Sequence, residues 1–276
     1  MNKHLDKLIR AAGAIALAGL VVGCAGTQQG GGAAAPSGGT GNVPRTDFDR
    51  TDIDRRANVR MDLASGYFAG GQYGTALNEV KQVLAIKPDM TEALTLRALI
   101  YAALGETSLA DDSFKRSLQL APRDPDTLHN YGWFLCQLKR WNEATAQFEQ
   151  ALAQPQYRGP ARTWLVKGVC EARAQQPAEA ERSLLKAFEL DPANPATSIN
   201  LGEVLLRSGQ AERARFYVKR VNANAEQSNS QSLWLALRIE RRLSNSTAVS
   251  ELAQELRKRF PQSPETTALD NGRFDD

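Results

Sequence analysis

The sequence predicts an all-α solenoid built from about six helical hairpins, and its internal period is the main evidence. Six alanines recur at spacings of 34, 34, 36, 34 and 34 residues: Ala76, Ala110, Ala144, Ala180, Ala214 and Ala248. Twelve residues before each of them the chain again has a small residue: Ala64, Ala98, Gly132, Gly168, Gly202 and Ala236. Residues 47–260 show no convincing alternating strand pattern. A period of this length with two fixed small positions is typical of stacked helix pairs.

Composition excludes several classes of protein. The chain has 276 residues, of which 42% are hydrophobic and 24% charged, as in ordinary globular proteins. Its 34 basic and 31 acidic residues give a net charge of +3, too balanced for binding nucleic acid by phosphate neutralisation. With 2 histidines and 3 cysteines, the chain lacks the composition of a histidine-rich metal site, a zinc ribbon or a disulfide-dense scaffold.

Residues 1–23 have the layout of a secretory signal peptide. Lys3, Lys7 and Arg10 precede a short apolar run, Ala11 to Val22, which is about half the length of a spanning helix. The run ends in LVVGC, which resembles the bacterial lipobox, so Cys24 is expected to carry a diacylglycerol thioether and to begin the mature chain. The alternative is a single-pass anchor that happens to contain a cysteine.

Residues 24–46 are expected to form the lipidated cysteine and a flexible tether. From Ala25 to Pro44 the chain has no charge and no aromatic residue, and many glycines interrupt regular structure. Twenty such residues span about 25 Å. Ala25 occupies the position at which an aspartate tends to retain lipoproteins of this kind at the inner membrane. The signal therefore implies the periplasmic face of the outer membrane.

Residues 47–261 carry the repeats. The small residues allow two antiparallel helices to approach closely, while larger residues such as Leu63, Tyr67 and Val80 fill the space around them. Glycines stand at the turn between the two helices, where a left-handed residue is favoured: Gly71, Gly105 and Gly209. Prolines close the second helix of several repeats: Pro88, Pro122 and Pro192. The two extra residues between Ala144 and Ala180 fit a longer loop at 154–160.

This pattern resembles the tetratricopeptide repeat over residues 57–261. The resemblance implies a right-handed α-solenoid of about six tetratricopeptide repeats whose concave face is lined by the first helix of each repeat, helix A. Residues 262–276 follow as a C-terminal tail, and their Ser, Pro, Thr and Asp content favours fraying.

Positions 5, 9 and 12 of helix A are expected to face the concave groove. They read Met61, Ser65, Phe68; Thr95, Leu99, Ala102; His129, Trp133, Cys136; Leu165, Val169, Ala172; Ile199, Glu203, Leu206; and Leu233, Leu237, Glu240. This face is apolar and has no paired Lys/Arg carboxylate clamp, so it suits an apolar or amphipathic protein segment. The candidate partner-binding residues are Met61, Phe68, Leu99, Trp133, Leu165 and Val169. Alternatively, opposite walls of a tight superhelix bury one another and leave no free groove.

Cys136 and Cys170 occupy near-equivalent points of helix A in the third and fourth repeats. After export to an oxidising compartment they are candidates for a disulfide across the longer loop, and the alternative is two buried thiols. One nearby histidine, His129, does not make a metal-ligand set, and no third group is evident for a catalytic Cys/His pair. No nucleophile, zinc or phosphate-loop motif was found. We expect no enzymatic activity, cofactor, small-molecule substrate or nucleic-acid partner.

The third and fourth repeats carry a more specific series, NYGWFLC at residues 130–136, then PQY at 155–157 and GVC at 168–170. With the lipobox and six repeats, this series resembles the type IV pilus biogenesis and stability lipoproteins called PilW or PilF. The resemblance implies an outer-membrane pilotin that binds the pilus secretin subunit and promotes its localisation and oligomer assembly. The alternative is a general periplasmic adaptor lipoprotein for outer-membrane-protein assembly or for recruiting cell-wall hydrolases.

Overall fold

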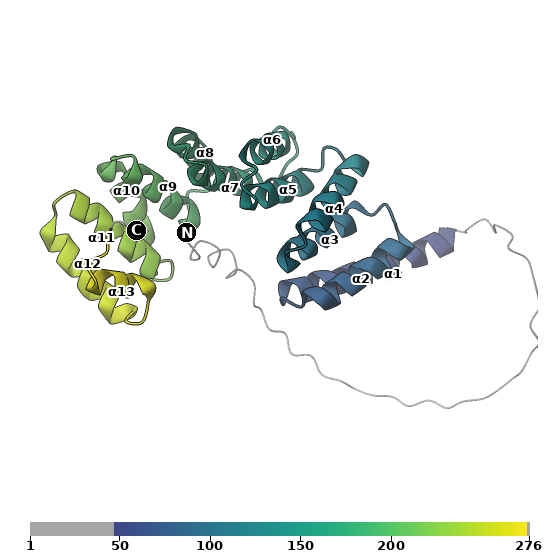
Figure 1. Ribbon diagram of the computed structural model, residues 1–276, viewed down its shortest axis with the longest axis horizontal. Coiled ribbons are helices and arrows are strands. Elements are labelled where there is room, and N and C mark those ends of the chain that lie inside the picture. The colour runs from purple at the N-terminus through teal and green to yellow at the C-terminus, as the bar shows by residue number, and fades with distance from the viewer. Residues whose placement is uncertain (1–46, 275–276) are drawn as a thin grey trace, which may run out of the picture. The chain divides into compact units, whose positions relative to one another are not determined.

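A computed structural model describes residues 47–274, which contain thirteen helices and no strand (Figure 1). The helices are α1 Asp47–Ala69, α2 Tyr73–Ile86, α3 Thr91–Leu104, α4 Thr107–Leu120, α5 Pro125–Gln137, α6 Trp141–Leu152, α7 Pro160–Arg173, α8 Pro177–Leu190, α9 Pro195–Arg207, α10 Ala211–Asn222, α11 Ser230–Arg242, α12 Ser246–Arg259 and α13 Pro264–Asp270. The predicted all-α class is confirmed for these residues. The signal peptide, Cys24 and the tether lie outside them.

Consecutive helices pack as six pairs, from α1·α2 to α11·α12. Two compact units hold these pairs: the first ends at Pro88 and contains α1 and α2, and the second begins at Asp89 and contains the remaining helices. Within the second unit, each helix A contacts the next helix A along the chain, in the order α3, α5, α7, α9 and α11. Pairs that each contact their neighbours form a solenoid, as the repeat period predicted.

Close approach of the two helices explains the small residues in the pattern. A Cβ atom on Gly132 would lie 2.7 Å from the ring of Phe148, and one on Gly168 would lie 2.6 Å from Leu184 Cγ. Ala98, at the same position in the second repeat, is fully buried. Since real Cβ atoms do not approach carbon atoms this closely, a larger side chain at these positions would push the pair apart.

The turns inside the repeats share one backbone conformation but use different residues. Gly71, Gly105 and Gly209 have φ values of 73°, 82° and 77°. The equivalent turns of the third, fourth and sixth repeats are made by Lys139, Gln175 and Ser244, with φ values of 61°, 61° and 58°. The left-handed geometry predicted for the three glycines therefore occurs in all six repeats, although L residues adopt it at a cost.

In the first unit, α1 packs on α2 through a face that includes the buried Ala57 and Ala64. Leu63, which the sequence placed in the core, is 48% exposed, so that prediction is wrong. Tyr131, its equivalent in the third repeat, is buried because it packs against Phe114 of the preceding repeat. Leu63 has no such cover, because no described helix precedes α1. The first described turns of α1 carry ion pairs within the helix, between Asp52 and both Arg55 and Arg56.

The sixth repeat is shifted by one residue from the 34-residue spacing. The link before α11, residues 223–229, adds one residue, so Gly209 and Ser244 at equivalent turns are 35 positions apart. Ala236 and Ala248 therefore miss the helix crossing and line an open cavity of about 470 Å³. The predicted role of these two alanines is wrong. A shift of one residue turns each helical side chain by about 100°, and Leu237 is fully buried instead.

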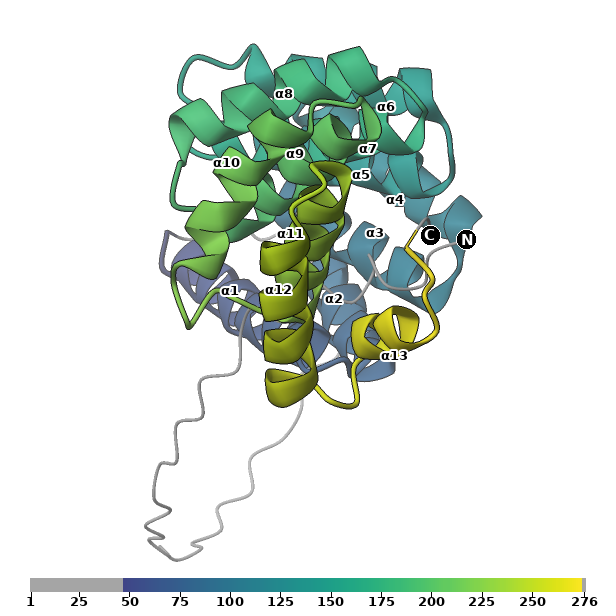
Figure 2. The same cartoon turned by 90° about the vertical axis from the view of Figure 1, so that its left-hand side faces the viewer.

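Residues 262–274 also differ from the expected frayed tail. Ser263 caps α13 by accepting a hydrogen bond from the Thr266 backbone, and Pro264 stands at the first turn. The helix contacts α11 and α12, beside which Figures 1 and 2 show it in yellow. The chain then returns to α11 through Phe274, which stacks on Trp234 with ring centroids 5.4 Å apart.

Candidate functional site

The six candidate partner-binding residues fall on four A helices in both units. Met61 and Phe68 lie on α1 in the first unit, where both are half-buried. The other four lie in the second unit: Leu99 on α3, Trp133 on α5, and Leu165 and Val169 on α7. Leu99, Trp133 and Leu165 are half-buried, whereas Val169 is only 9% exposed. Val169 therefore offers little surface to a partner.

Neighbouring side chains partly cover the half-buried residues of the second unit. Leu99 and Trp133 pack on a core cluster centred on Phe114 and Phe148, and Leu165 packs on a second cluster farther along the chain. The guanidinium of Arg173, at the end of α7, lies 5.0 Å from the centroid of the Trp133 ring. A cation over an indole ring is attracted by its negative face. Trp133 thus combines an apolar body with a charged neighbour on the next helix A.

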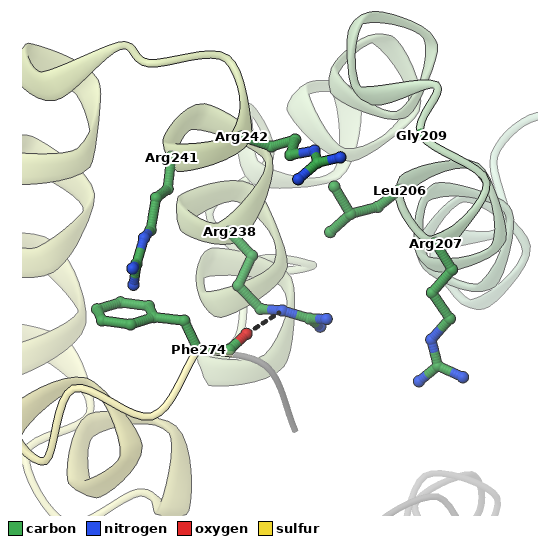
Figure 3. Close-up of a pocket in the computed structure, with 7 residues that line it drawn as sticks. All are labelled: Leu206, Arg207, Gly209, Arg238, Arg241, Arg242 and Phe274. Atoms are coloured by element: carbon green, nitrogen blue, oxygen red, sulfur yellow. Dashed lines mark hydrogen bonds between the residues drawn. The ribbon is translucent and has the colours of Figure 1, made fainter.

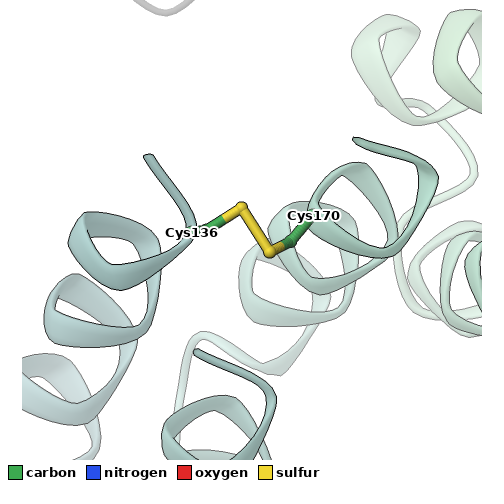
Figure 4. Close-up of a disulfide and its surroundings, with 2 residues drawn as sticks. All are labelled: Cys136 and Cys170. Atoms are coloured by element: carbon green, nitrogen blue, oxygen red, sulfur yellow. A yellow bond between two sulfur atoms is a disulfide. The ribbon is translucent and has the colours of Figure 1, made fainter. Parts of the chain in front are cut away.

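The two cysteines of these helices meet, as Figure 4 shows. Cys136 at the end of α5 and Cys170 in α7 are joined as a disulfide, with their Cα atoms 5.8 Å apart. Both side chains are buried beside Phe134 and Leu135 in the first core cluster. The bond joins the A helices of the third and fourth repeats across the longer loop between α6 and α7.

A buried hydroxyl group near the start of α7 also connects the third and fourth repeats. Thr163 Oγ1 lies 2.8 Å from His129 Nδ1 and 2.6 Å from the Tyr157 hydroxyl of the longer loop. Burial lowers the pKa of His129 to about 3, and the positive charge of Arg162 acts in the same direction. His129 is therefore neutral at physiological pH, and its environment suits a structural hydrogen bond.

Tyr131 anchors the junction between the second and third repeats. Its ring packs on Phe114 with centroids 5.1 Å apart, and its hydroxyl donates to Asp111 at 2.9 Å. Burial alone would raise the pKa of the Asp111 carboxyl, but hydrogen bonds from Lys115, Tyr131 and Arg140 lower it below its ordinary value. Burial and this carboxylate together raise the pKa of Tyr131. These contacts give Tyr131 a structural role at the junction of the two repeats, and no sequence motif marks its partner Asp111.

The register shift in the sixth repeat changes the chemistry of its helix A surface. Leu233 and Leu237, expected to face the groove, are 1% and 0% exposed. One residue farther along, Trp234 and Arg238 are half-buried and Arg241 is exposed. The sequence did not predict that these three residues lie on the surface of helix A, because the additional residue in the link before α11 carries no recognisable signal. The surface of α11 is therefore aromatic and basic rather than apolar.

Within residues 47–274, no three His, Cys, Asp or Glu side chains are grouped closely enough to hold a metal ion. None of the helices in this part of the chain has the length and hydropathy needed to cross a membrane.

Two family models described as tetratricopeptide repeat match the chain, one over residues 61–125 and 137–195 and the other over 172–238. A curated relative, the type IV pilus assembly protein PilF of Pseudomonas aeruginosa, is 25% identical over 227 residues, which cover 82% of this chain and 88% of PilF. The chain is thus similar to a pilus protein over most of the length of both.

Solved structures agree with this likeness. The crystal structure of PilW, described as a widely conserved type IV pilus biogenesis factor, superposes with a TM-score of 0.72 at 32% identity, covering 77% of this chain and 97% of PilW. A structure of Pseudomonas aeruginosa PilF superposes with a TM-score of 0.70 at 22% identity, covering 80% of this chain and 99% of PilF, and so supports the fold. Taken together, the repeats and the PilW match show that the chain belongs to the PilW/PilF family of tetratricopeptide-repeat proteins of type IV pilus biogenesis.

Proposed function

We propose that this chain is a non-enzymatic scaffold on the periplasmic face of the outer membrane that binds the type IV pilus secretin subunit and promotes its localisation and oligomer assembly. The observation that carries the proposal is the 32% identity with the pilus biogenesis factor PilW over 97% of that protein. The secretin partner comes from the resemblance of the NYGWFLC series and the lipobox to the same family.

Protein binding suits the surface that the repeats build. Stacked helix pairs present a row of helix A side chains to a partner, and here Leu99, Trp133 and Leu165 remain partly accessible on that row. Apolar and aromatic side chains with a charged neighbour are typical of the centre of an interface. The sequence also contains no GxSxG, HExxH or Walker motif.

A lipid anchor on Cys24 would hold the scaffold at the membrane. Two or three acyl chains make anchoring effectively stable, whereas one chain alone gives only marginal binding. The glycine-rich sequence of residues 25–44 predicts a tether that spans about 25 Å between the lipid anchor and the repeats. In that oxidising compartment we propose that Cys136 and Cys170 exist as the disulfide of Figure 4.

The function can be tested in cells from which the gene has been deleted. Secretin oligomers are measured by immunoblot of unheated membrane fractions, in strains that carry no copy, the wild type or Cys24→Ser. We expect the deletion to lower the oligomer content at the outer membrane and the wild type to restore it. Cys24→Ser should release the chain from the membrane sediment and fail to restore the oligomer. Ser37→Ala, a change in the tether, is the matched control and should behave as the wild type.

Two outcomes would contradict the proposal. If oligomer content and localisation are unchanged in the deletion strain, the chain is not a pilotin, and the general periplasmic adaptor becomes the better explanation. If Cys24→Ser stays in the membrane sediment, the anchor assignment is wrong. A pull-down with the lipidated chain, blotted for the secretin, tests the direct contact and separates a failure of binding from a failure of anchoring.

A further inference from the structure

A pocket rich in arginine lies on the surface of α9 and α11, in the last two repeats. Its volume is about 520 Å³, and it is lined by Leu206, Arg207, Gly209, Arg238, Arg241, Arg242 and Phe274 (Figure 3). The arginines come from the ends of the two A helices, and Phe274 reaches the pocket from the segment after α13. All the lining residues belong to the second compact unit.

Phe274 is held there by three different interactions. Its ring stacks on Trp234 at a centroid distance of 5.4 Å and an interplanar angle of 20°. The guanidinium carbon of Arg241 lies 3.8 Å from the centroid of the same ring, within the range of a cation–π contact. Arg238 Nε donates a hydrogen bond of 3.1 Å to the Phe274 carbonyl oxygen. Side chains of α11 thus contact both the ring and the backbone of Phe274, as a protein does when it binds a peptide.

The pocket has more positive charge than its own carboxylates balance. Arg207 and Arg238 share a single acidic partner, Glu203, at 2.8 and 3.0 Å. Among residues 47–274, no carboxylate pairs with Arg241 or Arg242. In the sequence Phe274 is followed directly by Asp275 and Asp276. An aromatic residue followed by acidic residues therefore complements the pocket in shape and charge.

We propose that this pocket is a docking site for a protein segment in which an aromatic residue is followed by acidic residues, and that Phe274 is an intramolecular competitor for it. A segment attached to the same chain acts at an effective concentration in the millimolar range when its linker is short. A partner segment must displace this competitor to bind. The proposal concerns the pocket alone and holds whether or not the partner is a pilus secretin.

The test uses a fluorescein-labelled peptide of residues 271–276, NGRFDD, and measures fluorescence anisotropy with the full chain. We expect Phe274→Ala to bind the peptide at least tenfold more tightly than the wild type, because the competing ring has been removed. A chain that ends at Gly272 is a second variant with the same expectation. Phe216→Ala, a change of an exposed aromatic residue on α10, is the control and should bind as the wild type does.

Chemical specificity is tested in the Phe274→Ala background. Arg241→Gln should weaken binding at least tenfold, and so should peptides with Phe replaced by Ala or with both Asp replaced by Asn. Folding of each variant is checked by circular dichroism. The proposal is overturned if neither Phe274→Ala nor the shortened chain binds the peptide more tightly than the wild type, since Phe274 then serves only to hold α13 in place. Equal binding of the Asn peptide would also overturn it.

Discussion

The ring of Phe148 lies so close to the backbone of Gly132 that a methyl group on this glycine would be 2.7 Å from Phe148 Cδ1 and Cε1. Phe148 is fully buried in the first core cluster, and because protein cores are closely packed, its ring cannot move without displacing its neighbours. We expect Gly132→Ala to lower the free energy of unfolding by about 2 kcal/mol through overpacking. Urea denaturation followed by circular dichroism measures this loss.

Gly66 provides the control for this substitution. It lies in α1, is exposed, and has no heavy atom within 4 Å of the position that a Cβ would take. Gly66→Ala should therefore stabilise its helix by about 0.5–1 kcal/mol, because alanine restricts the unfolded chain. If the two substitutions have effects of the same sign, close packing is not the reason for Gly132.

In the turn between α5 and α6, a substitution that introduces glycine is expected to stabilise the protein. Lys139 has a φ of 61° where three other repeats have glycine, and its side chain is exposed. Lys139→Gly should raise the free energy of unfolding by about 1 kcal/mol, since glycine adopts this conformation without steric cost. Gly105→Ala, at the same turn of the second repeat, should lower it by about 1 kcal/mol. Thermal unfolding of both variants checks the pair, and a loss of stability in Lys139→Gly would contradict the argument.

The regular part of the fold could be predicted because it depends on local sequence. Small residues such as Gly132 and Gly168 recur with the helix pairs, and each lies against its own hairpin partner. The six pairs and the meeting of Cys136 with Cys170 follow from the same period. Lys139 could not be recognised as a left-handed turn residue, because its neighbours rather than its own preference impose that conformation.

The surface was harder to predict because it depends on register and on contacts distant in the sequence. One additional residue in the link before α11 moved Arg238 and Arg241 to the positions assigned to Leu237 and Glu240. Phe274 contacts Trp234 across forty positions of the chain, and nothing periodic marks it. Leu63 is exposed because the burial of its equivalents depends on a preceding repeat, which no property of Leu63 itself reveals.

His129 predicts how stability depends on pH. Its pKa in the folded chain is lowered to about 3 from an ordinary value of 6.5. The unfolded chain therefore binds one more proton between these two values, so stability falls as the pH falls through this range. Relative to His129→Gln, the wild type should lose up to about 1.4 kcal/mol of additional stability per pH unit between pH 6 and 4. Urea denaturation at several pH values measures both slopes, and equal slopes would show that His129 is not buried in the neutral form.

The disulfide predicts a stability that depends on redox conditions. It closes a loop with a sequence separation of 34 residues, and the loss of conformational entropy in the unfolded chain caused by a loop of this length contributes about 4 kcal/mol to stability. Cys136→Ala with Cys170→Ala should lower the free energy of unfolding by this amount under oxidising conditions. A thiol reductant should lower the melting temperature of the wild type and leave that of the double variant unchanged. If the reductant affects neither protein, the two cysteines are buried thiols.

Trp133 tests whether the helix A surface captures the partner. It is half-buried, lies under Arg173 and belongs to the row that also contains Leu165. Tryptophan at the centre of an interface commonly contributes about 2 kcal/mol or more, so Trp133→Ala should weaken capture of the proposed secretin partner in a pull-down by about thirtyfold. Met61→Glu should also weaken it by placing a charge on α1.

Trp164→Ala is the matched control for Trp133→Ala. Trp164, which lies on α7, is half-buried like Trp133, but it lines a cavity with Asn142 and Glu179. Helical content measured by circular dichroism should be unchanged in all three variants. Loss of folding in Trp133→Ala would place this side chain in the core, and capture reduced equally in Trp164→Ala would show that the helix A surface is not where the partner binds.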